Sequence, residues 1–159
     1  MTEKLSPSAQ KVQDALFTFG LSCNVVEMPA STRTAKEAAD AVGCQVGQIV
    51  KTLVFKGKVS EKGILALVSG ANRVNEARLG EQIGEPIEKA NADFVREKTG
   101  YAIGGVPPLG HITSMLTLID EDLLSYDSVW AAAGTPNAVF CLNAADLSRI
   151  SNGKIVTVK

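Results

Sequence analysis

A lysine in the middle of an apolar segment is the first residue of this sequence that could carry chemistry. Lys51 stands inside the run Ile49–Phe55, whose β-branched residues are typical of a buried strand. Such strands seldom carry an unpaired charge, because desolvating an ammonium group is costly. Alternation along the strand could place Lys51 on the solvent face of a sheet. It could also place Lys51 at the floor of a cleft, where its three N–H donors would bind a phosphate or a sugar hydroxyl.

A glycine- and proline-rich segment is the second candidate. Residues 104–111 contain three glycines and two prolines and end at the only histidine, His111. Glycine lets a ligand approach the backbone closely, and proline stiffens the loop. Backbone N–H groups held in this way suit an oxyanion hole or a carboxylate site. A rigid turn without a ligand would have the same composition. The segment lacks the Gly-Lys-Ser/Thr of a phosphate-binding loop and the dinucleotide-binding fingerprint.

Two further segments and the cysteines favour structural roles. The small residues at 131–137 leave room either for a ligand or for a tight contact between elements. Asn72, Arg73 and Asn75 form a polar cluster of the kind that usually serves turns and helix caps. The three cysteines are too widely spaced for a disulfide framework or a metal motif, which favours small buried side chains.

Several common enzyme classes lack their characteristic residues in this sequence. There is no Gly-x-Ser-x-Gly elbow, no pair of histidines for zinc and no closely spaced acidic cluster for magnesium. A hydrolase built from these residues would depend on positioning, backbone donors and a lysine. Neither a metal nor another cofactor is therefore expected.

Composition narrows the expected partners. With 16 Lys and Arg against 17 Asp and Glu, the chain has no long-range attraction for a polyanion. A long footprint on nucleic acid, such as DNA, is not expected. A small site that grips one end of a nucleic acid needs only one or two cations and backbone donors. Residues 1–10 are polar, and no run approaches the roughly 20 apolar residues that span a bilayer, which predicts a cytoplasmic protein without a membrane partner.

The elements that must position these residues interleave irregularly along one predicted domain, residues 1–159. Apolar spacing and caps predict a helix over residues 6–20, with Val12, Leu16 and Phe19 on its buried face. Further helices are predicted at 35–42, 75–79, 91–98 and 143–147. Strands are predicted at 25–26, 49–55, 64–68, 115–119, 129–132, 138–142 and 155–158. The strict alternation of a doubly wound fold is missing, so we expect an α/β chain of the α+β type, with a mixed sheet flanked by helices.

Four segments of the sequence match a known family. They are residues 34–39, 47–55 and 99–111 and, more loosely, the turn at Gly134. The lysine followed by Thr-Leu and the later Gly-Gly-x-x-Pro-x-Gly are together quite specific. Nearly the whole chain resembles the YbaK-like deacylases associated with prolyl-tRNA synthetase, which also occur as an inserted editing domain in some bacterial prolyl-tRNA synthetases. The resemblance implies a mixed, mostly antiparallel sheet or a partly closed barrel, flanked by helices.

The resemblance also implies a pocket for the aminoacylated 3′ end of tRNA, with prolyl-tRNA synthetase as a candidate partner. Lys51 and Gly105 would be the catalytic residues. The free hydroxyl of the terminal adenosine, or a water that it orients, would attack the ester while backbone amides hold the oxyanion. The residues implied to bind the substrate are Thr34, Thr52, Gly104, Val106, Pro107, Pro108, Gly110, His111 and Gly134. For the lone histidine, a capping or packing role is an equal alternative.

Two positions bear on the choice of amino acid. The loop reads Gly-Gly-Val-Pro-Pro, where the cysteine-clearing branch of the family tends to carry Ser before the second proline, and Val139 stands where that branch has an acidic residue. Both differences favour Ala, 2-aminobutyrate, Ser or Thr over Cys. A second, hydrolytic site suits such small residues because a synthetase pocket discriminates one methylene by only about 1–3 kcal/mol. The alternatives are a non-catalytic module that binds an aminoacyl-adenosine end or an adenylate, and a purely structural domain.

Overall fold

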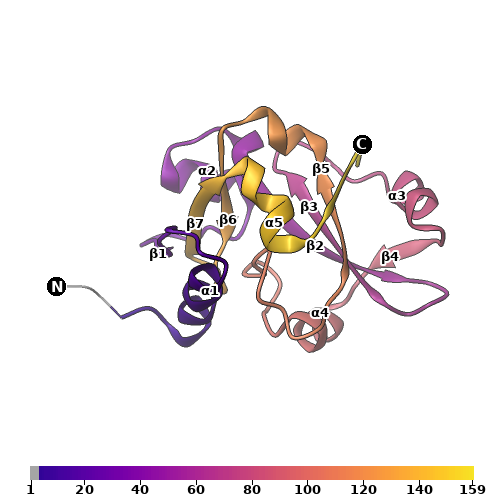
Figure 1. Cartoon of the computed structure of the whole chain (residues 1–159), viewed down its shortest axis with the longest axis horizontal. Coiled ribbons are helices and arrows are strands. Elements are labelled where there is room, and N and C mark those ends of the chain that lie inside the picture. The colour runs from indigo at the N-terminus through magenta and orange to yellow at the C-terminus, as the bar shows by residue number, and fades with distance from the viewer. Residues whose placement is uncertain (1–3) are drawn as a thin grey trace.

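An open sheet runs through the centre of the protein (Figure 1). The computed structural model describes residues 4–159, and in this part of the chain the strands follow the order β1-β7-β6-β2-β3-β5-β8, with β4 paired to β2. The strands are β1 (Val26–Glu27), β2 (Ile49–Gly57), β3 (Gly63–Ser69), β4 (Ile87–Lys89), β5 (Leu116–Asp120), β6 (Ser128–Ala132), β7 (Ala138–Asn143) and β8 (Lys154–Val156).

The sheet is mixed. β2 pairs antiparallel with β3 and β4, and β7 pairs antiparallel with β1 and β6. The pairs β2–β6, β3–β5 and β5–β8 are parallel. The predicted pairing of residues 49–55 with residues 64–68 is confirmed. The partly closed barrel is wrong: β1 and β8 lie at opposite ends of the sheet, and strands of two and three residues offer too few hydrogen bonds to close it.

The helices flank this sheet. They are α1 (Pro7–Thr18), α2 (Ala35–Val42), α3 (Glu76–Ile83), α4 (Ala92–Thr99) and α5 (Leu147–Ser151), with short 3-10 turns η1 (Val46–Gln48), η2 (Glu121–Ser125) and η3 (Ala144–Asp146). Thr34 begins α2 in a capping box with Glu37, and the side chains of Asn75 and Asn91 cap α3 and α4. The helix after Asn75 continues past its predicted end to Ile83.

Alternating side chains of β2 and β3 divide the interior into two cores. Val50 and Val54 pack in the larger core, together with α1 and the loop after α4. Phe55 packs in the second core, together with α3 and the end of the chain. Alternation along β2 therefore places Lys51 on the second side and Thr52 on the side of the larger core.

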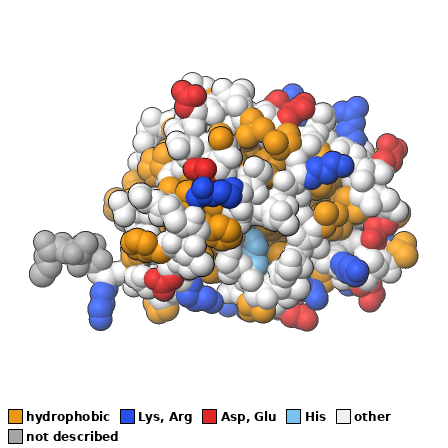
Figure 2. Space-filling view, viewed as in Figure 1, with side chains coloured by type: hydrophobic (Ala, Val, Ile, Leu, Met, Phe, Trp, Pro, Cys, Tyr) orange, Lys and Arg blue, Asp and Glu red, His pale blue; other side chains and the backbone are white. Residues whose placement is uncertain are grey.

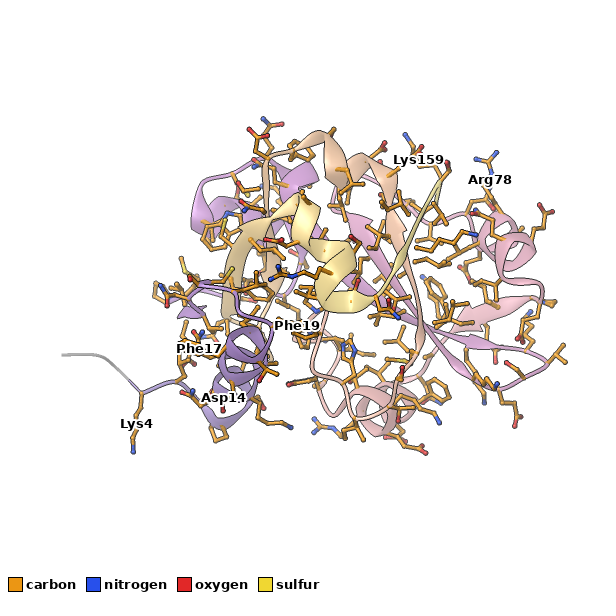
Figure 3. All side chains as sticks on the ribbon, viewed as in Figure 1. Lys4, Asp14, Phe17, Phe19, Arg78 and Lys159 are labelled. Atoms are coloured by element: carbon orange, nitrogen blue, oxygen red, sulfur yellow. The ribbon has the colours of Figure 1, made fainter. Side chains whose placement is uncertain are left out.

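The buried face of α1 is narrower than predicted. Val12 and Leu16 are fully buried, but α1 ends at Thr18, and Phe19 is 41% exposed. Figure 3 shows Phe17 and Phe19 at this end of the helix. Helical periodicity predicts the direction of a side chain only while the helix lasts, so the prediction fails one residue beyond it.

Two smaller predictions also need correction. Strand β4 was not predicted, because a run of three residues is too short to show alternation. The cysteines, Cys23, Cys44 and Cys141, are free as predicted, but each is half-buried instead of fully buried.

Candidate functional site

The site begins where β2 parts from β6. The two strands pair only at Ile49 and Val50, and β4 joins the same edge of β2 only from Phe55 onward. Between these points, no strand within residues 4–159 covers this edge of β2. The sheet is therefore split beside Lys51.

A cleft of about 380 Å³ occupies this split. Five residues predicted for the site line it, namely Thr34, Lys51, Thr52, Gly104 and Val106. The rest of its wall is Thr32, Arg33, Ala35, Ala38, Ile49, Val50, Leu53, Ile103, Trp130, Ala131, Ala132 and Val139. The structure thus brings together the strand and the glycine-rich loop that the sequence singled out separately.

Lys51 lies on the wall of the cleft and is half-buried. Its Nζ donates a hydrogen bond to the backbone carbonyl of Asn72, at 2.5 Å. Burial lowers the pKa of the Lys51 ammonium below its usual value, and the nearby Arg73 charge lowers it further, whereas the carboxylate of Asp120 acts in the opposite direction. Lys51 thus lines a cleft and does not lie on an open solvent face of the sheet, which was the alternative interpretation.

The hydroxyl of Thr52 is a polar atom without a partner. Its Oγ1 is buried and makes no hydrogen bond to any described residue. A buried hydroxyl left in this way costs about 1–3 kcal/mol, so such atoms call for an explanation. Thr52 also lines the cleft, so this unpartnered hydroxyl lies on a residue of the cleft wall.

The backbone of Thr52 also faces the open edge. Along a strand, the backbone groups of successive residues point to opposite edges. The Ile49 carbonyl accepts from the Gly70 N–H on the β3 side at 2.7 Å, and the Val54 carbonyl accepts from the Ala90 N–H on the other side at 3.2 Å. Thr52 lies two residues before Val54, so its backbone groups point to the same edge of β2 as those of Val54. The N–H of Thr52 therefore points toward the cleft.

The front of the glycine-rich loop forms the opposite wall. Gly104 has a φ of 93°, and a Cβ at this position would lie 2.8 Å from Cγ of Arg33, whose side chain extends over the loop. Glycine is required here both by the backbone conformation and by this contact. Arg33 brings a second cation to the rim beside Lys51.

Gly105 joins the loop to a neighbouring turn. Its N–H donates to the carbonyl of Ala102 at 3.0 Å, and its carbonyl accepts from the N–H of Gly134 at 2.8 Å. A Cβ on Gly105 would lie 2.9 Å from the backbone nitrogen of Thr135. Gly105 therefore lets the loop pack closely against the turn, while Gly134 lets the turn pack against α1, where a Cβ would lie 2.7 Å from the Ser8 carbonyl oxygen; neither glycine lines the cleft.

The back of the loop packs against α1 instead of the cleft. Pro107 and Pro108 are buried, and Gly110 lies near Ala15 of α1. His111 Nε2 donates to the Pro107 carbonyl at 2.6 Å, which ties the loop to itself. Burial lowers the pKa of His111 below its usual value, although the bond to Pro107 opposes this. None of these four residues lines the cleft.

Thr34 has a structural task at the cleft rim. Its Oγ1 accepts from the Glu37 N–H at 3.1 Å and donates to the Glu37 carboxylate at 3.0 Å. The α2 N-terminus is thereby held at the edge of the cleft. The hydroxyl that the sequence suggested for substrate binding already serves the capping box.

Sequence reasoning missed three residues around Lys51. Arg33 lies in a polar run without a pattern, and Asn72 had been assigned to turn chemistry. Asp120 ends a strand and is only 1% exposed, yet it accepts hydrogen bonds from Ser69 N–H at 3.0 Å and Asn72 Nδ2 at 2.8 Å. An acidic residue directly after the strand-forming segment Leu-Thr-Leu-Ile at 116–119 was the available signal for Asp120.

Within residues 4–159, no helix is long and apolar enough to cross a membrane, and no three acidic, histidine or cysteine side chains are grouped to hold a metal ion. Figure 2 shows positive and negative side chains interspersed on the visible face. On this face no large basic patch is seen, in agreement with the near-neutral composition.

The sequence profile of the aminoacyl-tRNA editing domain matches residues 29–150. This range contains every residue that lines the cleft. The chain belongs to the aminoacyl-tRNA editing domain family. The resemblance first seen in the segments around Lys51 and Gly104 is therefore confirmed.

Relatives of this editing domain occur both alone and within larger enzymes. A solved structure described as a candidate trans-editing enzyme for prolyl tRNA synthetase is 51% identical, with a TM-score of 0.92, and the match covers 98% of this chain and 99% of that one. EbsC of Enterococcus faecalis, named as a candidate Cys-tRNA(Pro)/Cys-tRNA(Cys) deacylase, is 24% identical over 79% of this chain and 76% of its own. The proline–tRNA ligase of Thermoanaerobacter sp. (strain X514) is 30% identical over 58% of this chain, which is 16% of the ligase.

Proposed function

We propose that this editing domain hydrolyses the ester bond between a small amino acid and tRNA, acting on tRNA-Pro that carries the wrong residue. The observation that carries the proposal is the cleft itself. It joins a half-buried ammonium, an unpartnered threonine hydroxyl and a glycine-rich loop in about 380 Å³. Such a site suits the end of a nucleic acid, in agreement with the absence of a large basic face on the visible side (Figure 2).

Lys51 is proposed to anchor the terminal adenosine. One of its three N–H donors is used by the Asn72 carbonyl, which leaves two for a ribose hydroxyl or a phosphate oxygen. Arg33 at the rim adds a planar guanidinium, which suits a second phosphate contact. Together the two cations would hold the 3′ end without a long nucleic-acid footprint.

The oxyanion donors are proposed to come from both walls of the cleft. Thr52 offers its free hydroxyl and a backbone N–H on the open strand edge. The N–H groups of Gly104 and Val106 are used in no turn or strand hydrogen bond of the described residues. Gly105 was the expected donor, but its N–H is occupied by Ala102. We therefore assign Gly105 to the packing that holds the loop in place. Its neighbours Gly104 and Val106 would donate their N–H groups to the oxyanion.

The attacking group is proposed to be a water molecule oriented by the free hydroxyl of the terminal ribose; it adds to the ester carbonyl, and the esterified ribose oxygen leaves as a hydroxyl with the release of the free amino acid. The cleft wall contains no cysteine, histidine or carboxylate, and its side-chain hydroxyls are those of Thr32, Thr34 and Thr52. His111 faces the Pro107 carbonyl instead. Catalysis would thus rest on orientation and on stabilising the oxyanion, which are the largest contributions in many enzymes.

A small amino acid is proposed because of the cleft wall. Ala35, Ala38, Ala131 and Ala132 line it with methyl groups, and Val139 adds an apolar side chain where the cysteine-clearing branch carries an acid. Alanine and 2-aminobutyrate fit this surface better than polar residues, since an unpaired polar group would be desolvated. The relation to a prolyl-tRNA synthetase trans-editing candidate and to a proline–tRNA ligase supports tRNA-Pro as the acceptor.

A deacylation panel tests the proposal. Purified protein is incubated with tRNA-Pro carrying Ala, 2-aminobutyrate, Ser, Thr, Cys or Pro, and the release of free amino acid is followed. We expect release of Ala and 2-aminobutyrate to be fastest and Pro-tRNA-Pro to survive. Protection of the ester without release would indicate a binding module and would overturn the assignment as a hydrolase. Fast release of Cys alone would overturn the choice of amino acid.

A further inference from the structure

A buried polar network stands behind Lys51, outside the cleft wall. Its centre is the carboxylate of Asp120 at the end of β5, which is 1% exposed. This carboxylate accepts from the Ser69 N–H at 3.0 Å, from Asn72 Nδ2 at 2.8 Å and from the Asp122 N–H at 2.9 Å. Three donors satisfy the buried charge, so the loop that follows β3 cannot move without breaking them.

The same loop supplies the acceptor for the Lys51 ammonium. Nζ of Lys51 bonds to the backbone carbonyl of Asn72, while the side chain of Asn72 bonds to both Asp120 and Asp122 at 2.8 Å. Ser69 tightens the start of the loop, because its Oγ donates to the Gly47 carbonyl at 2.7 Å. The carbonyl that holds the lysine is therefore fixed by carboxylates that the lysine does not touch.

Charge supports this arrangement. Asp120 forms no ion pair within residues 4–159, and its negative charge favours the ammonium form of Lys51. Arg73, which follows Asn72 in the same loop, acts against the ammonium form of Lys51. Asp122 is paired with Lys159 at 2.9 Å, at the end of the chain labelled in Figure 3. Asp120 is thus the carboxylate of this network whose charge is available to the lysine.

We propose that Asp120 and Asn72 are positioning residues, which hold the Lys51 ammonium in the direction of the cleft. This inference rests on the proposed deacylase function, in which Lys51 anchors the end of the substrate. Neither residue lines the cleft, so they act through Lys51 alone. Orientation of an anchoring group matters because a displacement of about 1 Å can cost on the order of 100-fold in rate.

The variant Asn72→Ala gives the sharpest test. It keeps the backbone carbonyl that Lys51 contacts and removes only the amide that ties this carbonyl to Asp120 and Asp122. We expect kcat/KM for deacylation to fall between about 10- and 100-fold. Asn75→Ala is the matched control: it is the same substitution three residues later and removes the cap of α3, so it should lower stability but leave kcat/KM unchanged.

A second readout separates positioning from a general loss of structure. In nitrogen-15 labelled protein, the hydrogen-bonded ammonium of Lys51 should give a proton–nitrogen signal, assigned by its absence in Lys51→Met. The signal is expected to disappear in Asn72→Ala and in Asp120→Asn and to persist in Asn75→Ala. In the Lys51→Met background, Asn72→Ala should cause no further loss of affinity for a non-hydrolysable aminoacyl-adenosine amide, because coupled residues are not additive.

Three results would overturn the inference: full kcat/KM in Asn72→Ala, an ammonium signal that survives in that variant, or effects of Asn72→Ala and Lys51→Met that add. The test does not depend on whether Asp120→Asn folds. All three results come from Asn72→Ala, which leaves the buried carboxylate of Asp120 in place. If the wild-type protein releases no amino acid, the proposed function fails, whereas the ammonium signal still tests the network by itself.

Discussion

The two walls of the cleft are held by different forces. On the β2 wall, a polar network runs from Asp120 through Asn72 to Lys51. On the loop wall, Gly105 packs backbone against backbone with the turn at Gly134, and buried prolines fill the space behind. Electrostatics thus positions one wall and steric fit the other. A small change of charge should damage the first wall, and an added methyl group should damage the second.

Removing the lysine should have the largest effect. Lys51→Ala is expected to lower kcat/KM by about 100-fold or more, because the anchoring charge is lost. The fold should survive, since a half-buried ammonium carries its own desolvation cost. Deacylation kinetics and urea unfolding measure the two quantities. Lys56→Ala, farther along the same strand, is the control, and unchanged turnover in Lys51→Ala would remove this residue from the mechanism.

A methyl group added at Gly105, behind the loop wall, should have the next largest effect on activity. Gly105→Ala would place a Cβ 2.9 Å from the Thr135 nitrogen, so one of the two backbones must shift. We expect a loss of about 1–3 kcal/mol in the free energy of unfolding and at least about tenfold in kcat/KM. Gly20→Ala is the control, because its φ of 75° carries strain while nothing lies within 4 Å of the added Cβ. Equal kinetic losses in both variants would refute the steric account of this wall.

Removing the unpartnered hydroxyl of Thr52 should lower kcat/KM less than the lysine substitution does, without lowering stability. Thr52→Val is expected to lower kcat/KM about tenfold, as loss of one good hydrogen bond in the transition state would. Stability should stay the same or rise, because the buried hydroxyl has no partner in the free protein. Thr99→Val makes the matched comparison: its hydroxyl donates to Val95 at 2.7 Å, so stability should fall by about 1 kcal/mol with turnover intact. A loss of stability in Thr52→Val would argue against a free hydroxyl.

The histidine behind the loop predicts the smallest effect, on stability alone. Because the pKa of His111 is lowered in the folded protein, the unfolded chain takes up its proton at a higher pH. The stabilisation is present above about pH 6.5, the value for an unperturbed histidine, and is lost as pH falls through the folded pKa. Urea unfolding at pH 7.5 and 5.5 should show a smaller decrease for His111→Gln than for wild type. Equal decreases would mean that the histidine is not buried in its neutral form.

Much of this protein was predictable because the signals are local. The apolar face of residues 35–42, ended by Gly43, and the β-branched run around Lys51 predicted α2 and β2 within a residue or two. Phe19 failed because burial beyond a helix end depends on what packs there. For the site, the sequence indicated Lys51 and the loop from Gly104, of which Lys51, Gly104 and Val106 line the cleft.

Residue types and local spacing alone determined which groups can do chemistry here: one lysine in an apolar strand, a glycine-rich loop, and no metal-binding or nucleophile–base pattern within the printed sequence. The tertiary structure decided which of them meet. β2 parts from β6 after Val50 because pairing between distant strands depends on the whole sheet, and this split opens the cleft. The tertiary structure also places the loop beyond Val106 against α1 and places Asp120 behind Lys51. Contacts across long sequence separations leave no local periodicity in the sequence, so neither placement could be predicted from it.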